Sequence, residues 1–592
     1  MPPPIPISNA DRARHAIGLI EQGNLKAAER LLKDVLKADP GQFDALLGLG
    51  VLCGMRGQDA DAVKHLTRAA RRNPRSDAAH YNLGQALIRL GRHAEAIEAL
   101  KAAAALAERG QIHEKLGDCM RQLGRLDEAA IHFVRAVDLE PANSLALSSA
   151  VETLRRLCDW SRLAELQQRL LAACAADRAV EPLLMLHVTD DPNLQRKAAQ
   201  AYWRTLVAPS APPSPRIARR DGAKIRVGYL SADFRQHPMV SVIAEAIELH
   251  DRARFEVTGL SYGQDDGSPQ RRRMERAFDR FVDMHGTSDQ RMAARIGECG
   301  IDILVDLSGY TANARLGVVA ARPAPIVCHY MGYPGTLGSP AYDYLIADRI
   351  VAPAGCDGDF SEALVRLPVC YWANDRKRAP AATTTRAEHG LPEDAIVLCS
   401  FNGQQKLSPV LLDIWARVLA AVPQSVLWLY ADHSTAADNL RREAAARGIT
   451  HDRLVIAGRL PPEQHLARIA LADLMLDAMP YGGHTTACDA LWMGVPVLTV
   501  AGRAFAARVG ASLLTHASLP HLITPDPQAY EREATALATD RPRLAALKAS
   551  ISGARGAGGL FDTAAFTRAL EAAYSEMWRR HRSALPPAPL AP

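Results

Sequence analysis

Residues 225–262 read IRVGYLSADFRQHPMVSVIAEAIELHDRARFEVTGLSY. The run Ile225–Ser231 is short and rich in β-branched and aromatic residues, Val240–His250 has the apolar spacing of a helix, and Phe255–Tyr262 is a second strand-like run. Strand, helix and strand in succession predict a parallel sheet, because the crossover between parallel strands is usually long enough to hold a helix.

The same alternation continues toward the C-terminus. Further strands are expected at Ile301–Leu307, Pro325–Met331, Ile396–Phe401, Ser425–Tyr430, Leu454–Ala457, Leu474–Leu476 and Val495–Val500, with a pause near 348–380. This pattern predicts two doubly wound α/β lobes, an N-terminal lobe at 222–385 and a C-terminal, nucleotide-type lobe at 386–580. Ligands of such sheets bind at the carboxyl ends of the strands, so a site is expected in the cleft between the lobes.

The first part of the chain is a repeat. Gly23, Gly57, Gly91 and Gly124 follow one another at intervals of 34, 34 and 33 residues, and an alanine comes five residues after each. A second glycine series and a proline series keep the same period: Gly50, Gly84 and Gly117, and Pro40, Pro74 and Pro141. Each unit therefore predicts a helix, a glycine turn, a helix and a proline stop.

This period resembles the tetratricopeptide repeat over about residues 10–145, and Val151–Leu206 has the pattern of further helix. We predict an all-α repeat domain at 10–206 whose concave surface binds peptide, the alternative being a scaffold without a specific ligand. A proline-rich linker is expected at 207–221, and disorder at 1–9 and 581–592.

The composition excludes several classes of protein. Charged residues make up 23% of the 592 residues and hydrophobic ones 48%, which disfavours wholesale disorder and a membrane span. The chain has 70 Lys and Arg residues against 65 Asp and Glu residues, and a net charge of +5 is too small for a dedicated nucleic-acid binder. The basic run Arg271–Arg273 is interpreted as a solvated helix face. Ten cysteines without a C-x-x-C pair, and no leader-like start, favour a reducing cytoplasm.

The loops after the predicted strands hold the candidate chemistry. Neither the dinucleotide fingerprint nor the ATP phosphate loop is present, so redox cofactors and ATP hydrolysis lose support. The stretch 482–489, GGHTTACD, precedes a predicted helix at Ala487–Met493, and its threonines and free N–H groups predict a diphosphate site. Lys406 would add the positive charge that a departing diphosphate needs.

Two further residues have both a chemical and an ordinary interpretation. Asp489 could accept hydrogen bonds from ribose hydroxyls, or simply be a favourable charge in the first turn of a helix. His237 could accept or relay a proton near neutral pH, or be a histidine of no chemical importance at a helix start.

Taken together, these loops resemble the catalytic region of protein O-linked N-acetylglucosamine transferases, including the SPINDLY-like members. The similarity runs from about Lys224 to Ile523, and the order of repeats and catalytic region matches as well. The matching motifs are Val227–Phe234 with His237-Pro238, Ser308–Thr311, Arg322–Pro325, Gly332–Thr336, Ser425–Leu429 and His484–Thr486.

The resemblance implies a GT-B fold and an inverting, metal-independent transfer of a sugar from a nucleotide donor to Ser or Thr of proteins. It places His237 near the reacting sugar and acceptor hydroxyl, and Gly332 beside the sugar. The remaining donor contacts that it implies are Lys406, His484, Thr485 and Thr486 on the diphosphate, Asp489 on the ribose, and His465 and Arg468 on the nucleoside side. Asp283 falls where the family has an aspartate proposed to take part in proton removal.

Three questions stay open at this point. The acceptor proton could leave to His237, to Asp283, or to the donor's own phosphate through a water chain. Gly403 and Pro462 depart from longer polar side chains found in some members, so UDP-N-acetylglucosamine is the expected donor and GDP-fucose, used by plant SPINDLY-type relatives, the alternative. The acceptor could also be a polysaccharide, a lipid or a flagellin-type protein.

Two expectations concern partners and metals. The partners expected are the nucleotide sugar and acceptor proteins or peptides in the repeat groove, with no nucleic acid; the non-enzyme alternative is a repeat scaffold with degenerate lobes. No metal or other cofactor is expected, since the Asp-x-Asp match at Asp357-Gly358-Asp359 lies in a Gly/Pro-rich connection and is interpreted as a turn.

Overall fold

The structure is a computed structural model that describes residues 8–206, 224–378, 383–553 and 559–591. The chain divides into two compact units, Met1–Leu154 and Arg155–Pro592. Most of the segment 1–9 and the whole of the predicted linker 207–221 lie outside the described residues. Among the described residues, no helix combines the length and the hydropathy that crossing a membrane requires.

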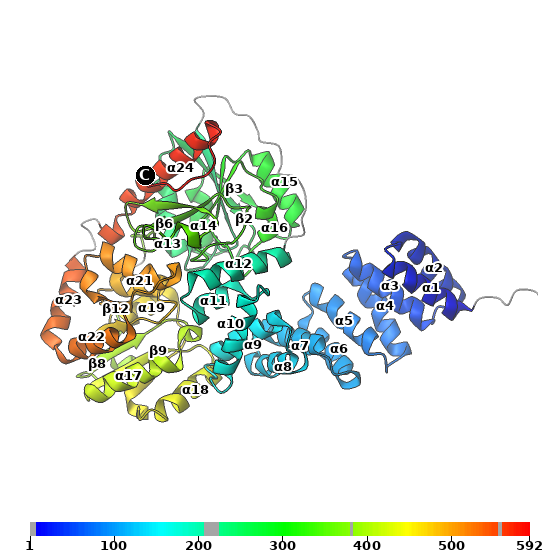
Figure 1. Cartoon of the computed structure of the whole chain (residues 1–592), viewed down its shortest axis with the longest axis horizontal. Helices are drawn as coiled ribbons and strands as arrows, with labels where there is room; N and C mark the ends of the chain where they lie inside the picture. The colour runs from blue at the N-terminus through cyan, green and yellow to red at the C-terminus, as the bar shows by residue number, and fades with distance from the viewer. Residues whose placement is uncertain (1–7, 207–223, 379–382, 554–558, 592) are drawn as a thin grey trace, which may run out of the picture. The chain divides into compact units, whose positions relative to one another are not determined.

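The first unit consists of paired helices, drawn in blue in Figure 1. The pairs are α1 (Asn9–Glu21) with α2 (Leu25–Ala38), α3 (Phe43–Met55) with α4 (Asp59–Arg72), α5 (Asp77–Arg89) with α6 (His93–Leu106), and α7 (Gly110–Gln122) with α8 (Leu126–Leu139). The turn inside each pair contains a glycine at positive φ, between 71° and 78°, which explains the first glycine series. The alanines five residues later are fully buried.

The second glycine series marks the close approach of paired helices. A Cβ atom on Gly50, Gly84 or Gly117 would lie 2.4–2.7 Å from the side chain of Leu66, Leu100 or Phe133 on the partner helix. These contacts confirm the predicted repeat architecture. Helix α9 (Ser144–Arg156) follows the fourth pair.

The second unit begins with helices that the sequence places in the repeat domain. They are α10 (Leu163–Ala175), α11 (Pro182–Val188) and α12 (Pro192–Leu206). The predicted domain limits remain predictions, but the division between compact units falls at Leu154 and not at residue 206.

The first lobe is a seven-stranded parallel sheet in the order β3-β2-β1-β4-β5-β6-β7. Its strands are β1 (Ile225–Ser231), β2 (Phe255–Ser261), β3 (Arg280–Asp283), β4 (Ile303–Asp306), β5 (Ile326–His329), β6 (Tyr344–Asp348) and β7 (Ala363–Leu367). The connections carry α13 (Val240–Glu248), α14 (Pro269–Ala277), α15 (Asp289–Cys299) and α16 (Leu316–Ala320). Strand β7 lies where the sequence pattern pauses, and β3 and β6 are further strands that the pattern does not predict.

The second lobe is a six-stranded parallel sheet in the order β10-β9-β8-β11-β12-β13. Its strands are β8 (Ile396–Ser400), β9 (Ser425–Tyr430), β10 (Leu454–Ala457), β11 (Leu474–Leu476), β12 (Val497–Val500) and β13 (Ile523–Thr524). Its helices are α17 (Pro409–Ala421), α18 (Ser434–Ala445), α19 (Pro462–Ile469), α20 (Thr485–Trp492), α21 (Phe505–His516), α22 (Pro527–Thr539) and α23 (Arg541–Gly553).

Both sheets are doubly wound, which confirms the predicted fold class. The strand order reverses between β1 and β4 in the first sheet and between β8 and β11 in the second. These reversals leave a crevice at the carboxyl ends of the strands, which is where open α/β sheets bind ligands.

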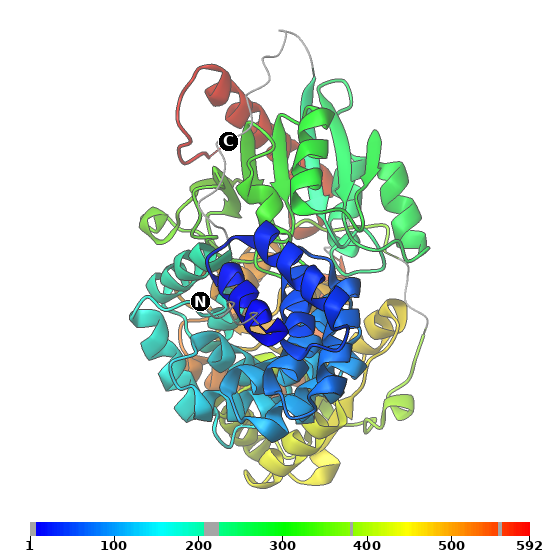
Figure 2. The same cartoon turned by 90° about the vertical axis from the view of Figure 1, so that its right-hand side faces the viewer.

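The C-terminal helix α24 (Thr563–Arg582) corrects the predicted limits of the lobes. It packs against α13, β5 and β7 of the first lobe, beside the green strands in Figures 1 and 2, although the prediction places everything from 386 to 580 in the second lobe. Tyr574 donates to or accepts from Tyr229 at 3.1 Å, and Glu571 accepts a hydrogen bond from His250 at 3.0 Å. Buried polar partners of this kind fix the helix on the first lobe.

The prediction of a disordered tail at 581–592 is wrong for the described part of it. Leu590 forms a parallel bridge with Val365, accepts a hydrogen bond from the Arg366 N–H and donates one to the Leu364 carbonyl, both at 2.8 Å. The prolines of the tail suggested disorder, but Leu590 is 7% exposed, because it finds an unpaired edge of β7 and an apolar contact there.

Candidate functional site

A cavity of about 420 Å³ lies at the carboxyl ends of the strands, where the loops of both lobes meet. Its volume lies within the usual range for small-molecule sites. Loops after β1, β4 and β5 contribute from the first lobe, and loops after β8 and β11 from the second. The lining residues used below are Asp233, His237, Thr311, Gly332, Trp372, Lys406, Tyr481, His484, Thr485 and Thr486.

Lys406 enters the cavity from a 3-10 turn, η3 (Gln404–Lys406), that follows β8. Its ammonium donates a hydrogen bond to the Gly482 carbonyl at 2.6 Å and lies 3.7 Å from the centre of the Tyr481 ring. Burial lowers the pKa of Lys406 to about 8, and the carboxylate of Asp477 opposes this shift only in part. The lysine is therefore mostly cationic at neutral pH and already stripped of much of its water.

Asp477 fixes the conformation of the loop that precedes α20. One oxygen of this buried carboxylate accepts hydrogen bonds from the backbone N–H groups of Ala478 and Gly483, at 2.8 and 2.6 Å, and from Asn402 at 3.1 Å. The other oxygen accepts from Thr499 at 2.8 Å. Because Asp477 fixes both ends of the loop, the start of α20 faces the cavity in a set position.

The start of α20 has the geometry that favours an anion. Within the described structure, no side chain caps this helix, and the first backbone bond of the helix is from the Cys488 N–H to the His484 carbonyl. The N–H groups of Thr485 and Thr486 thus remain for a ligand, at the positive end of the helix dipole. Lys406 is hydrogen-bonded to Gly482, just before these threonines. The residues predicted to bind a diphosphate, Lys406 and His484–Thr486, therefore line one cavity.

His484 is a neutral group in this cavity. Burial lowers its pKa well below the usual value, and the charge of Lys406 lowers it further. Its Nε2 atom lies 3.3 Å from the Ala506 carbonyl, so this nitrogen carries the proton and donates to that oxygen. His484 therefore presents Nδ1 as an acceptor and contributes no positive charge to an anion.

His237 lies on the first-lobe side of the same cavity. Its Nδ1 atom accepts a hydrogen bond from the Met239 N–H at 3.2 Å. Burial lowers the pKa of His237, and the carboxylate of Asp233, 3.8 Å away, opposes the shift. The neutral ring therefore carries its proton on Nε2 and acts as a donor, which disfavours proton removal by His237.

Gly332 lines the cavity, and the close approach of the loop after β4 leaves no room for a side chain on it. A Cβ atom there would lie 2.3 Å from the Leu307 carbonyl oxygen and 2.6 Å from that of Ser308. Both are backbone atoms after β4 and cannot turn away as a side chain could. The position is consistent with the expected place beside a sugar.

Asp283 is not among the residues that line the cavity. Its carboxylate forms an ion pair with Arg271 at 2.7 Å. Partial burial raises the pKa of Asp283, but hydrogen bonds from the His285 N–H and Arg271 outweigh this and hold it below the usual value. The expected role of Asp283 in proton removal therefore gains no support. Arg271 itself is 3% exposed, so the interpretation of the run 271–273 as a solvated face is wrong for Arg271, whereas Arg272 is exposed.

The two predicted nucleoside residues form a pair on α19. Arg468 donates to His465 Nδ1 at 3.0 Å and to the Gly458 carbonyl at 2.7 Å, and its guanidinium lies 5.1 Å from the centre of the Phe401 ring. Burial lowers the pKa of His465 to about 4, with Arg468 adding to the shift. They follow β10, next to the loop that carries Lys406, but are not among the lining residues of the cavity.

Asp489 has a partner that the sequence did not suggest. Arg378 donates to it at 2.5 Å while lying 4.7 Å from the centre of the Trp492 ring. Burial raises the pKa of Asp489 to about 6 in spite of the neighbouring guanidinium. A ribose hydroxyl would have to share or replace this contact. Asp489 is not among the residues that line the cavity with Lys406.

Tyr481, Asp233 and Trp372 are among the cavity residues that the sequence did not predict. Tyr481 directly precedes the diphosphate loop and Asp233 lies inside a quoted motif, so adjacency was a usable signal for both. Trp372 comes from the segment after β7 that was interpreted as a pause, and no local pattern indicates it. Its ring lies 5.7 Å from that of His484.

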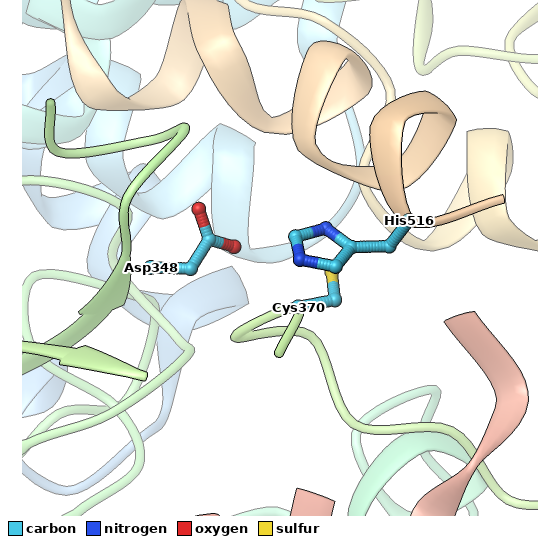
Figure 3. A group of neighbouring side chains, drawn as sticks. All are labelled: Asp348, Cys370 and His516. Carbon is cyan, nitrogen blue, oxygen red and sulfur yellow. The ribbon is translucent and has the colours of Figure 1, made fainter. Parts of the chain in front are cut away.

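A second cluster of titratable side chains lies apart from this cavity. Figure 3 shows Asp348 at the end of β6, Cys370 after β7 and His516 at the end of α21, whose ligand-type atoms lie within 4.8 Å of one another. The hydroxyl oxygen of Ser512 already fills the space among them, at 2.5 Å from Asp348, 3.3 Å from Cys370 and 3.5 Å from His516 Nδ1. Burial raises the pKa of Cys370 well above its usual value. The cluster is therefore a hydrogen-bonded network that joins the two lobes, not a fit for an ion.

The Asp-x-Asp match at Asp357-Gly358-Asp359 is a 3-10 turn, as predicted. Asp357 pairs with Arg366 at 2.9 Å. These carboxylates are not among the lining residues of the cavity, so they are not placed to hold a metal on the diphosphate.

Comparisons with known proteins agree with this arrangement. The sequence profile of glycosyl transferase family 41 matches residues 213–382 and 378–570, and tetratricopeptide-repeat profiles match 19–64 and 56–110. An O-GlcNAc transferase mutant of Thermobaculum terrenum has a solved structure that superposes with a TM-score of 0.68 at 27% identity, covering 92% of this chain and 98% of that one.

Two plant proteins illustrate the similarity in sequence. A probable UDP-N-acetylglucosamine–peptide N-acetylglucosaminyltransferase, SEC, of Arabidopsis thaliana is 33% identical over 426 residues, which is 69% of this chain and 44% of that protein. A SPINDLY protein of the same plant, with the same descriptive name, is 32% identical over 60% of this chain and 40% of its own length. The chain thus spans less than half the length of these relatives.

Proposed function

The chain belongs to glycosyl transferase family 41, and from that premise we propose that it transfers N-acetylglucosamine from UDP-N-acetylglucosamine to Ser or Thr hydroxyls of proteins, with inversion and without a metal. The observation that supports this most is the cavity in which His237 of the first lobe meets Lys406, Thr485 and Thr486 of the second. Several relatives are named as transferases that use the same donor and a peptide acceptor.

The mechanism follows from where charge develops. The acceptor oxygen attacks the anomeric carbon, the bond from that carbon to the diphosphate breaks, and negative charge builds on the leaving diphosphate. Lys406 and the N–H groups at the start of α20 are positioned to stabilise that charge, which lowers the barrier because it is greater in the transition state than in the ground state. A cation and a helix start here supply what a metal supplies elsewhere.

In this proposal, two groups can take the proton from the Ser or Thr hydroxyl. They are the donor's own phosphate and the carboxylate of Asp233, which lines the cavity. His237, with its proton on Nε2, donates a hydrogen bond to an oxygen of the donor or acceptor. Gly332 leaves room for the sugar next to it.

The acceptor is proposed to be a protein segment bound in the repeat groove, in the cytoplasm. The first unit supplies four helix pairs of tetratricopeptide type, an architecture that presents a concave binding surface. All ten cysteines are unpaired thiols, as expected for a reducing compartment.

The test is a transfer assay with purified full chain. The chain is incubated with UDP-N-acetylglucosamine and a protein lysate, with and without EDTA, and modified Ser or Thr peptides are identified by mass spectrometry. The proposal predicts an added N-acetylhexosamine that EDTA does not abolish. No transfer from any common nucleotide sugar would refute it, and loss of transfer with EDTA would refute metal independence.

Alternative donors and acceptors are separate outcomes of the same assay. Transfer from GDP-fucose instead of UDP-N-acetylglucosamine would identify a SPINDLY-type O-fucosyltransferase, and the similarity to SPINDLY proteins is the observation that keeps this candidate. Sugar recovered on polysaccharide or lipid would change the acceptor class. Absence of nucleotide binding by calorimetry would instead favour a repeat scaffold with degenerate lobes.

A further inference from the structure

The turn that carries Lys406 is held by residues that precede the catalytic lobes in the sequence. Arg155, at the end of α9, donates through Nε to the Gln405 carbonyl at 2.8 Å. The thiol of Cys158 donates to the Gln404 carbonyl at 3.6 Å. Two consecutive carbonyls of the Gln404–Lys406 turn are thus bound from one short stretch of chain some 250 residues earlier.

Arg155 is a buried cation with an unusual environment. It is 3% exposed, and among the described residues no carboxylate forms an ion pair with it. Burial lowers its pKa to about 10, which leaves it charged at neutral pH. Burying a charge without a counter-ion costs free energy. An anion bound beside the Lys406 turn would offset this cost for Arg155.

The helix α11 completes the surroundings of Lys406. The ring of His187 lies 4.8 Å from that of Tyr481, whose ring also contacts the Lys406 ammonium. Both Arg155 and Lys406 lower the pKa of the buried His187, beyond the effect of burial itself, so both cations face this one side chain. Arg155, His187 and Lys406 are therefore neighbours around the same turn and ring.

We propose that Arg155 is a positioning residue of the transferase site, which holds the Gln404–Lys406 turn so that the ammonium meets the diphosphate and adds positive charge behind it. The segment 155–188 is then part of the donor site and not only a spacer between repeats and lobes. This inference rests on the proposed function, because it assigns the anion to the diphosphate of the donor.

The experiment compares nucleotide and nucleoside binding in the full chain. Affinities for UDP and for uridine are measured by calorimetry and competition in the wild type, Arg155→Gln and Arg155→Lys, with GDP and guanosine instead if GDP is the nucleotide that binds. We expect Arg155→Gln to weaken UDP binding about tenfold, because it removes a positive charge near the diphosphate and a hydrogen bond that holds the Lys406 turn, and to leave uridine binding unchanged. Arg155→Lys, which keeps the charge, should lose less.

The matched control is Arg453→Gln. Arg453 also donates to backbone carbonyls, those of Ser425 at 3.0 Å and Leu419 at 2.8 Å, but at the first residue of β9, the strand end opposite to the carboxyl end. It should lower thermal stability without changing the ratio of UDP to uridine affinity. A merely structural Arg155 would behave in the same way, so an unchanged ratio in Arg155→Gln, or an equal loss of both ligands, overturns the inference.

Failure of the proposed function gives a different result. If the wild type binds UDP and Arg155→Gln binds it less well, but no sugar is transferred to any acceptor, the positioning role stands and the transferase activity falls. If the wild type transfers sugar and Arg155→Gln retains full kcat and UDP affinity, the activity stands and the positioning role falls. If the wild type binds neither UDP nor GDP, both are refuted.

Discussion

At the residue scale, the proposed binding of a diphosphate depends most on Lys406. Its ammonium is held by the Gly482 carbonyl and the Tyr481 ring, so its position is fixed before any ligand arrives. We expect Lys406→Ala to lower kcat by about two to three orders of magnitude, because it removes a charge that acts mainly in the transition state. Steady-state kinetics with UDP-N-acetylglucosamine would measure this, and a change confined to KM would contradict it.

The pH dependence follows from the lowered pKa of Lys406. With a pKa of about 8, the Lys406 side chain is charged below pH 8 and loses its charge as the pH rises through that value. We therefore predict that kcat/KM falls above about pH 8 in the wild type, and that Lys406→Arg, whose guanidinium does not titrate there, loses this basic limb. A basic limb that persists in Lys406→Arg would show that another group titrates.

The tautomer of His237 leads to a second prediction. Since Nδ1 accepts from the Met239 N–H, the ring acts as a donor through Nε2. His237→Ala should lower kcat about 10- to 100-fold, the cost of one hydrogen bond to a charged group, and His237→Gln, which keeps an N–H donor, should lose less. Equal losses in both variants, with rescue of His237→Ala by imidazole, would instead identify His237 as the base.

At the element scale, close packing of paired helices limits the repeat glycines. A Cβ atom on Gly84 would lie 2.7 Å from Leu100, whereas one on Gly18, inside α1, would contact nothing within 4 Å. Gly84→Ala should destabilise its helix pair by about 1–3 kcal/mol. Gly18→Ala should be neutral or stabilise by about 0.5–1 kcal/mol. Hydrogen exchange of α5 and α6 measures the first effect; equal exchange in both variants would contradict the packing account.

The elements show how far the sequence could predict the fold. The repeat helices and strands such as β1, β9 and β10 follow from glycine spacing and apolar runs, which are local signals. Strand β13 has two residues, and β3 and β7 each include charged residues, so no unbroken apolar run marks these strands in the sequence. Trp372 was missed as a consequence, because it follows β7.

The site shows the same limit. Lys406, His237 and His484–Thr486 were predicted together because each lies in a loop directly after a strand, and the sheet topology brings such loops to one cavity. The pairing of Asp489 with Arg378, and that of Asp283 with Arg271, could not be predicted. Both depend on packing between segments that the sequence pattern does not relate.

At the scale of the whole second unit, α24 joins the C-terminus to the first lobe. Glu571 accepts from His250 at 3.0 Å and from the Asp251 N–H at 2.7 Å; Glu571 and His250 are buried, whereas Asp251 is exposed. Glu571→Ala would leave both donors without a partner and should destabilise the fold by about 2–4 kcal/mol. Thermal unfolding would measure the loss.

The control for Glu571 lies on the same helix. Glu576 pairs with Arg579 at 2.6 Å on the surface, so Glu576→Ala should change the melting temperature little. Equal melting temperatures for the two variants would contradict the return of α24 to the first lobe.

The account depends most on where a nucleotide diphosphate binds in this chain. A crystal structure of the full chain with UDP tests this most directly. We predict that the phosphates lie within hydrogen-bonding distance of the Lys406 ammonium and of the N–H groups of Thr485 and Thr486. UDP bound away from Lys406 and α20 in well-ordered crystals would contradict the account.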